Sequence, residues 1–168
     1  GRTERRERST VFENRFYRVA FAPGGLQSVY DKDLGREVLD TRTFLGFEVF
    51  TMRSVGNGAG EFGRVQQPTM DGFARLGGLA PAWTLVAEES GPVRTVFRFK
   101  RTLPNVAVEE KVVFYDGLKR IDCEVALLGW DGLPYREFRL ALPPAGGDSV
   151  AYEVPMGVVE VGRSEAKC

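Results

Sequence analysis

Apolar and polar side chains alternate near the start of the chain. Tyr17, Val19 and Phe21 fall on one face of a predicted strand, and residues 26–30 form a second strand-like run. Between them, residues 23–25 have the sequence Pro-Gly-Gly, which supplies the fixed and the positive φ values that a chain reversal needs. The pattern predicts an antiparallel hairpin.

The alternation returns in the second half of the chain and predicts short strands separated by turns. Asp116 and Gly117 match a two-residue type I′ hairpin turn. No segment has the periodicity of a convincing amphipathic helix, so the expected fold is an all-β, mostly antiparallel β-sandwich. The expected strands are 83–88, 93–103, 106–114, 121–127 and 138–142, and the alternation at 150–154 begins a last segment that ends near Val161.

Three segments depart from this alternation. Residues 1–10 are charged or polar and predict a solvated linker, which leaves 11–168 as the β-sandwich domain. Residues 44–53 are mostly apolar on both parities, as in a strand buried on both faces or a two-sided junction. Residues 56–78 hold seven glycines and Pro68, which predicts a long loop.

Composition narrows the classes of function. The chain has 168 residues, enough for one domain with a sizeable core, and 23 basic residues balance 23 acidic ones. This balance predicts no attraction to nucleic acid or to an anionic membrane. No apolar run approaches the roughly 20 residues that cross a bilayer, and Cys123 and Cys168 suggest no disulfide framework, so we expect a cytoplasmic protein.

The absence of histidine from the sequence is the strongest chemical constraint. It removes the usual general base, the Ser-His-Asp and Cys-His arrangements, and the commonest zinc ligand. We therefore expect no catalytic residue and no metal site in this chain.

Residues 58–63 formally match the dinucleotide-binding pattern G-x-G-x-x-G. That pattern works only between a strand and a helix N-terminus that holds the pyrophosphate. No such unit surrounds it here, so a loop is expected.

Asp31, Asp33 and Glu37 resemble the beginning of a calcium-binding loop, in which alternate oxygens converge on one ion. The glycine comes one position early, and Arg42 stands where the closing glutamate belongs. A plain turn is the expected outcome.

Glu109 and Glu110 are neighbours on a predicted strand and point to opposite faces. Glu110 shares its parity with an apolar row and is expected to point inward, where a carboxylate needs a partner or a raised pKa. Arg101 has matching parity, which favours a structural ion pair. An irregular strand that exposes Glu110, or a role in an active site, remain the alternatives.

Trp130 and Asp131 follow the strand that contains Cys123. They offer an aromatic face and a carboxylate to a sugar, since carbohydrate C–H faces stack on aromatic rings. The alternative is a turn whose indole packs against the sandwich or a neighbouring domain. Trp83 and Tyr135 are weaker candidates of the same kind, and Cys123 is expected to be a small core residue.

Five segments, in this order, resemble the β-sandwich region that follows the catalytic domain in family 38 α-mannosidases. The opening hairpin is the most similar, and the other four are short strand-and-turn sequences. The five are 13–37, Glu-Ser-Gly-Pro-Val-Arg at 89–94, Arg-Ile-Asp-Cys-Glu-Val at 120–125 with Trp130-Asp131 behind it, Arg-Leu-Ala-Leu-Pro at 139–143, and Tyr-Glu-Val-Pro-Met-Gly at 152–157.

The resemblance implies part of a large supersandwich of the galactose mutarotase-like type. In that family a domain upstream of the sandwich carries the zinc ligands and the nucleophilic aspartate of a retaining glycosidase. Neither set of residues can be matched onto this sequence. The chain is therefore expected to be a noncatalytic fragment that braces or shapes the active site of an upstream zinc-dependent domain of the same polypeptide.

Two other functions compete with this one. A stand-alone carbohydrate-binding module would need an exposed aromatic platform. An enzyme on the same fold, such as an aldose epimerase, would call for histidine together with a glutamate base, and histidine is missing.

Overall fold

The computed structural model describes residues 11–53, 72–78, 84–132, 136–147 and 149–161. The predicted linker at 1–10, the glycine-rich pattern at 58–63, Trp83, Tyr135 and Cys168 lie outside these residues. Within them the chain is almost entirely β, with one short 3₁₀ helix, η1 (Leu76–Gly78). All strand pairs are antiparallel, which confirms the predicted all-β class.

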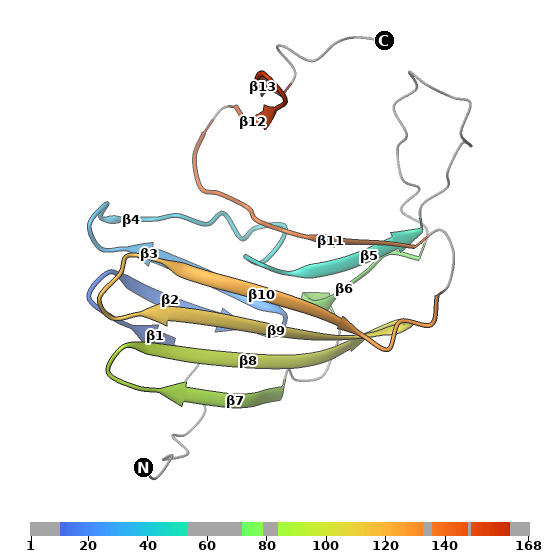
Figure 1. Ribbon diagram of the computed structural model, residues 1–168, viewed down its shortest axis with the longest axis horizontal. Coiled ribbons are helices and arrows are strands. Elements are labelled where there is room, and N and C mark those ends of the chain that lie inside the picture. The colour runs from blue at the N-terminus through green and yellow to red at the C-terminus, as the bar shows by residue number, and fades with distance from the viewer. Residues whose placement is uncertain (1–10, 54–71, 79–83, 133–135, 148, 162–168) are drawn as a thin grey trace.

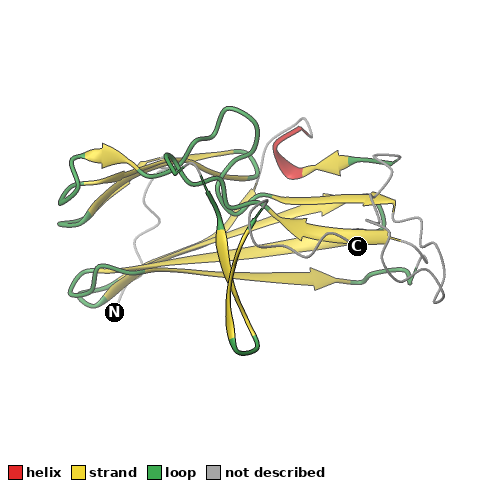
Figure 2. Cartoon of the chain, turned by 90° about the horizontal axis from the view of Figure 1, so that it is seen from above, coloured by secondary structure: helices red, strands yellow, loops and turns green. Residues whose placement is uncertain are grey.

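The strands form two layers (Figures 1 and 2). One layer is a sheet of long strands in the order β10-β9-β8-β7, and the other contains a sheet in the order β1-β2-β3-β4 and a sheet in the order β11-β5-β6. A separate hairpin pairs β12 with β13. The strands are β1 (Val11–Glu13), β2 (Tyr17–Ala22), β3 (Gly25–Asp31), β4 (Arg36–Glu37), β5 (Val49–Arg53), β6 (Ala74–Arg75), β7 (Thr84–Ser90), β8 (Arg94–Leu103), β9 (Val106–Tyr115), β10 (Ile121–Leu128), β11 (Arg136–Leu140), β12 (Ala151–Val154) and β13 (Gly157–Glu160).

The larger hydrophobic core lies between the β2–β3 hairpin and strands β8 and β9. Phe21 stands at its centre, with its ring centroid 4.7 Å from that of Phe97 and 5.3 Å from that of Phe99. The predicted inward row of β2 is confirmed, because Tyr17, Val19 and Phe21 are all buried. The members of this core are Phe16, Tyr17, Val19, Phe21, Leu26, Val29, Leu39, Phe97, Phe99, Val112 and Phe114.

A second, smaller core lies under β5 and η1, toward the other end of β8 and β9. It consists of Val49, Leu76, Leu103, Val106 and Val108. Both cores draw on the inner face of the same two long strands. Residues of β8 and β9 between the two cores therefore face the interior as well, and one of these residues is Glu110.

Two expectations about connections are wrong. The β9–β10 hairpin exists, but Phe114 pairs with Ile121, so its connection is longer than two residues and neither Asp116 nor Gly117 has the positive φ of a type I′ turn. The extra length lets Lys119 reach a carboxylate on β3, a tertiary contact that local turn chemistry does not indicate.

The expected loop at 56–78 is also too long. Its described part contains β6 and η1, which pair with and pack against β5. These elements are too short to produce a periodic pattern in the sequence.

Gly24 in the β2–β3 turn has a φ of +102°, and an added Cβ would lie 2.5 Å from the backbone nitrogen of Gly77. Gly24→Ala is therefore expected to lower the free energy of unfolding by about 1–3 kcal/mol, through left-handed strain and collision with η1. Urea unfolding measures this loss. Gly117→Ala is the matched control, because nothing lies within 4 Å of its added Cβ; an equal loss in both variants would contradict the explanation.

Candidate functional site

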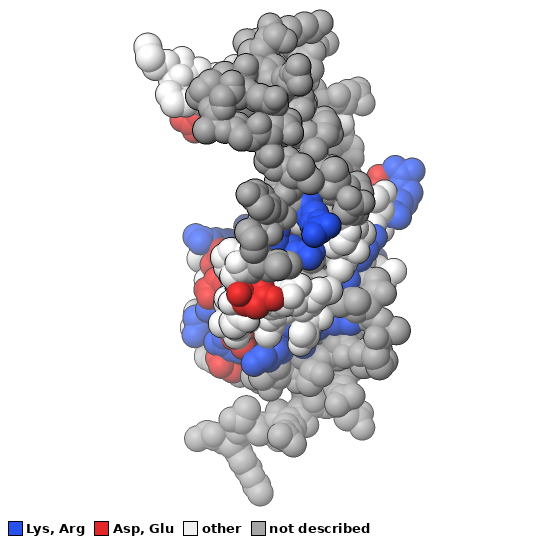
Figure 3. Space-filling view, turned by 90° about the vertical axis from the view of Figure 1, so that its right-hand side faces the viewer, with Lys and Arg blue, Asp and Glu red and all other residues white. Residues whose placement is uncertain are grey.

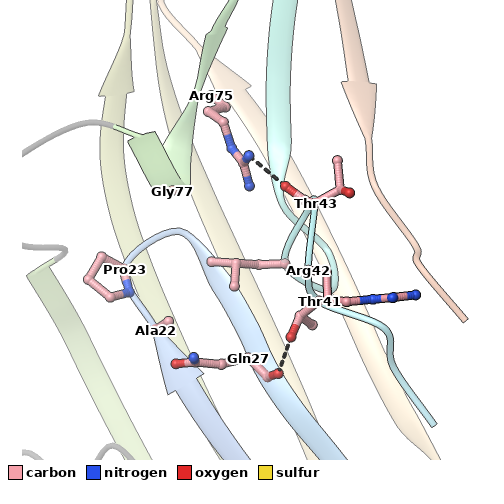
Figure 4. Close-up of a pocket in the computed structure, with 9 residues that line it drawn as sticks. Ala22, Pro23, Gln27, Thr41, Arg42, Thr43, Arg75 and Gly77 are labelled. Atoms are coloured by element: carbon pink, nitrogen blue, oxygen red, sulfur yellow. Dashed lines mark hydrogen bonds between the residues drawn. The ribbon is translucent and has the colours of Figure 1, made fainter. Parts of the chain in front are cut away.

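A pocket of about 340 Å³ opens where the β2–β3 turn, the loop at 41–45 and η1 meet (Figure 4). Its volume lies at the lower end of the range of small-molecule sites, about 300–1,000 Å³. Its wall combines apolar groups with hydroxyl, amide and guanidinium groups. The lining residues are Ala22, Pro23, Gln27, Thr41, Arg42, Thr43, Leu45, Arg75 and Gly77.

Glu48 lies beneath this pocket with no exposed surface. Its Oε1 accepts hydrogen bonds from Nε of Arg75 at 2.6 Å and from the backbone nitrogen of Gly77 at 2.9 Å. Its Oε2 accepts from Nη2 of Arg75 at 2.5 Å and from the backbone nitrogen of Leu45 at 2.9 Å. Four donors therefore compensate a carboxylate that burial alone would strongly destabilise.

Arg75 is held in place by more than this bidentate pair. Its Nη1 donates to the carbonyl oxygen of Thr43 at 2.6 Å, and its guanidinium carbon lies 4.7 Å from the ring centroid of Phe44. The hydrogen bonds to Glu48 raise the pKa of Arg75, so the guanidinium stays charged. The pocket wall formed by Arg75 is thus rigid and bears a charge that Glu48 balances.

The backbone before Glu48 explains how a charged side chain enters the core. Phe47 has a φ of +58°, a left-handed conformation that is unusual for a bulky residue. This turn interrupts strand alternation, so Glu48 and the next residue, Val49, are both buried. Strain of this kind costs of order 1–3 kcal/mol and persists only where surrounding contacts enforce it.

The sequence pattern marks neither Glu48 nor Arg75 as a candidate functional residue. Glu48 is the one acidic residue within the apolar run at 44–53, and that isolation was the available signal. Arg75 lay inside the expected long loop, where nothing in its neighbours marked it. The two residues stand 27 positions apart, so only tertiary structure brings them together.

Glu110 points inward as expected and is 4% exposed. Its Oε1 is buried and accepts no hydrogen bond, so no hydrogen bond from Arg101 reaches this oxygen. Burial, and next the charge of Glu48, raise the pKa of Glu110 to about 8, while the charge of Arg101 lowers it. The carboxyl group is therefore largely protonated at neutral pH, and the attraction of Arg101 only partly offsets its desolvation.

Trp130 and Asp131 lie at the far end of β10. The indole is 51% exposed, and its edge packs against Phe138 with the ring planes at 85°. The Asp131 carboxylate accepts a hydrogen bond from the side-chain amide of Asn105. The packing contact is present, yet half of the indole surface stays open to solvent.

In the turn at 31–37, the first two carboxylates hold the ammonium group of Lys119 between them. Nζ of Lys119 lies 2.9 Å from an oxygen of Asp31 and 2.9 Å from an oxygen of Asp33, and this contact lowers the pKa of Asp31. Glu37 turns away and binds the Ser28 hydroxyl and the backbone nitrogen of Val29. The plain-turn interpretation agrees with this arrangement, because the three carboxylates do not converge.

Cys123 is a free thiol that packs against the larger core, and burial raises its pKa to about 12. This agrees with the expected core position and makes the thiol unreactive near neutral pH. Among the described residues, no three His, Cys, Asp or Glu side chains could together hold a metal ion. None of the helices in the described ranges is long and apolar enough to span a bilayer.

Charges of both signs are interspersed on the surface. Figure 3 shows Lys and Arg side chains beside Asp and Glu side chains on the face that it presents. This distribution agrees with the equal numbers of basic and acidic residues in the sequence.

The fold and the pocket define an antiparallel β-sandwich with a polar, charge-balanced pocket at the β2–β3 turn. No protein-family model matches this chain, and no curated protein matches it.

Proposed function

We propose that this chain is a noncatalytic β-sandwich segment of an α-mannosidase-like glycoside hydrolase. Two observations support the proposal: five segments resemble the sandwich region of family 38 α-mannosidases in the same order, and the described strands form antiparallel layers. In this proposal the segment is part of a galactose mutarotase-like supersandwich. It braces or shapes the active site of an upstream domain that binds zinc and cleaves α-mannosides.

The β12–β13 hairpin is the observation that carries the proposal. It pairs with no other strand of the described chain, and Figure 1 shows it standing apart from the other sheets. Met156 at its tip is 106% exposed and Val158 is 70% exposed. An isolated two-stranded hairpin is marginally stable in water, so a partner surface that covers these apolar residues would stabilise it.

The partner in this proposal is another part of the same polypeptide, the upstream catalytic domain. Exposed apolar side chains also occur on β10, on β11 and on the segments next to the hairpin, and those that lie beside it would extend the covered surface. They are Leu127, Leu128, Leu140, Leu142, Val150 and Val161. The free thiol of Cys123 favours a reducing compartment, and we propose the cytoplasm for the whole enzyme.

The reading frame upstream of Gly1 provides the decisive test. We expect it to encode a glycosidase domain with His-x-Asp and Asp motifs, and a frame that encodes no such domain would overturn the proposal. The purified chain alone should not hydrolyse an aryl α-mannoside, and hydrolysis by it would contradict the noncatalytic assignment.

The partner surface can be tested once that upstream domain is expressed separately. The two polypeptides should co-elute in gel filtration, and Val158→Asp should abolish co-elution because it places a charge in the covered surface. Leu118→Asp is the control, since Leu118 is 58% exposed on a different loop. Co-elution that survives Val158→Asp would exclude the hairpin from the contact.

The half-exposed indole of Trp130 favours a second candidate, a stand-alone carbohydrate-binding module. In this case the isolated chain binds mannose oligomers, and Trp130→Ala reduces affinity about fivefold or more through loss of ring stacking, an aromatic contribution of about 1 kcal/mol or more. Isothermal titration measures the change. Unaltered affinity in Trp130→Ala would remove Trp130 from any sugar site.

A further inference from the structure

We infer that the pocket at the β2–β3 turn binds a single uncharged pyranose unit, either free or at the end of an oligosaccharide. The choice of mannose as the probe rests on the proposed function, but the site itself is argued from the pocket. No aromatic side chain is among its lining residues, so it differs in kind from a stacking platform such as Trp130.

The polar groups in the pocket wall suit hydroxyl groups. Within the described residues, the Gln27 amide and the Thr43 hydroxyl make no hydrogen bond, so each can donate and accept. The Thr41 hydroxyl donates to the carbonyl oxygen of Gln27 at 2.8 Å and keeps its oxygen lone pairs (Figure 4). A ring that carries several hydroxyl groups, each a donor and an acceptor, matches this set.

The charge balance disfavours an anionic ligand. Glu48 neutralises Arg75 through two hydrogen bonds, and Asp40 forms a salt bridge with Arg42. Figure 4 also shows the Arg42 side chain extending away from the space between Pro23 and Gln27. Arg75 still has N–H groups beyond the three that are engaged, and these can donate to a neutral oxygen without a net charge to attract an anion.

The pocket is preformed, which lowers the entropic cost of binding a small polar ligand. Gly77 is fixed by its hydrogen bond to Glu48, and the added Cβ at Gly77 would lie 2.8 Å from Oε1 of that carboxylate. An added Cβ at Gly24 would lie 2.5 Å from the backbone nitrogen of the same Gly77. The β2–β3 turn, η1 and the buried Glu48 therefore pack closely against one another.

The size of the pocket limits the ligand to one sugar ring. A volume of about 340 Å³ is near the minimum for a small-molecule site. Ala22, Pro23 and Leu45 supply apolar surface for the C–H face of that ring. A second ring of an oligosaccharide would extend into solvent and add little affinity.

The test is a titration of the isotope-labelled full chain with methyl α-D-mannopyranoside, in which NMR chemical shifts report binding. We expect shifts at the backbone amides of residues 22–27 and 41–45, and an increase of about tenfold in Kd for the double variant Gln27→Ala/Thr43→Val, since each neutral hydrogen bond changes affinity several-fold. Glu109→Gln on β9, outside the pocket lining, is the control and should leave Kd unchanged, and Trp130→Ala tests whether binding occurs at the indole instead. The fold of each variant is checked by the dispersion of the same spectra.

Three outcomes would overturn the inference: no shifts in the pocket, binding that Trp130→Ala removes but the double variant does not, and inorganic phosphate that displaces the mannoside from the pocket amides. None of these bears on the upstream reading frame. A chain joined to a glycosidase domain but without pocket shifts would retain the proposed function and lose the pocket. Shifts in the pocket of a chain whose upstream frame encodes no glycosidase domain would support the pocket and overturn the proposed function.

Discussion

Arg75→Ala is expected to lower the free energy of unfolding by about 3–5 kcal/mol, because it leaves the charge of Glu48 buried without its partner. Glu48 has no exposed surface, and Arg75 supplies two of its four hydrogen bonds. Removing one member of a buried pair costs far more than the pair itself contributes. Urea unfolding at constant pH, with the slope m compared between variants, measures the loss.

Two further variants separate this explanation from simple loss of packing. Arg42→Ala breaks an exposed salt bridge with Asp40 and should cost about 0–1 kcal/mol. Glu48→Gln combined with Arg75→Ala removes both charges and should recover part of the stability lost in Arg75→Ala alone. A loss in Arg75→Ala no larger than that in Arg42→Ala would show that the buried pair is not the cause.

The stability of the wild-type chain is expected to fall as pH rises from about 6 to about 8, by about 2 kcal/mol. Burial raises the pKa of Glu110 from its ordinary 4.5 to about 8, so the folded chain holds a proton that the unfolded chain has released. The stabilisation is complete below the unfolded pKa and is lost as pH rises through the folded pKa. The chain contains no histidine, whose titration would otherwise overlap this range.

Glu110→Gln should flatten this pH dependence, since the amide keeps the shape of the protonated carboxyl group and cannot ionise. Urea unfolding at about pH 6, 7 and 8 measures the slope, for which one proton corresponds to about 1.4 kcal/mol per pH unit. Glu109→Gln is the control, because Glu109 lies on the opposite face of β9 and should leave the slope unchanged. A steep slope that persists in Glu110→Gln would assign the titration to another group.

The local pattern of apolar and polar residues was sufficient to predict the hairpins and the rows of side chains that point into the core. Tyr17, Val19 and Phe21 are buried because a strand has a period of two, and the positions between them, Arg18 and Ala20, are more exposed. The same reasoning placed Glu110 inward, correctly, although an acidic residue on an apolar row is an exception to the usual pattern. These predictions needed only near neighbours in the chain.

Contacts between distant segments were beyond such reasoning. The β9–β10 connection is longer than the local Asp-Gly signal predicts, and its length lets Lys119 reach Asp31 on β3. The sequence pattern predicts a loop at Arg75, since β6 is only two residues long and gains its structure from pairing with β5. The pocket could not be found for the same reason: its three walls come from segments that are separate in sequence.

By itself the sequence determined the all-β class, the antiparallel hairpins, the charge balance and the absence of histidine chemistry. Each of these follows from composition or from side-chain alternation over a few residues. Only the tertiary structure decided that Glu48 and Arg75 form a buried pair, that Glu110 is held protonated between two cores, and that a pocket opens above Glu48. The physical reason is that burial of a charge, and its compensation, depend on which distant groups the fold brings within hydrogen-bond distance.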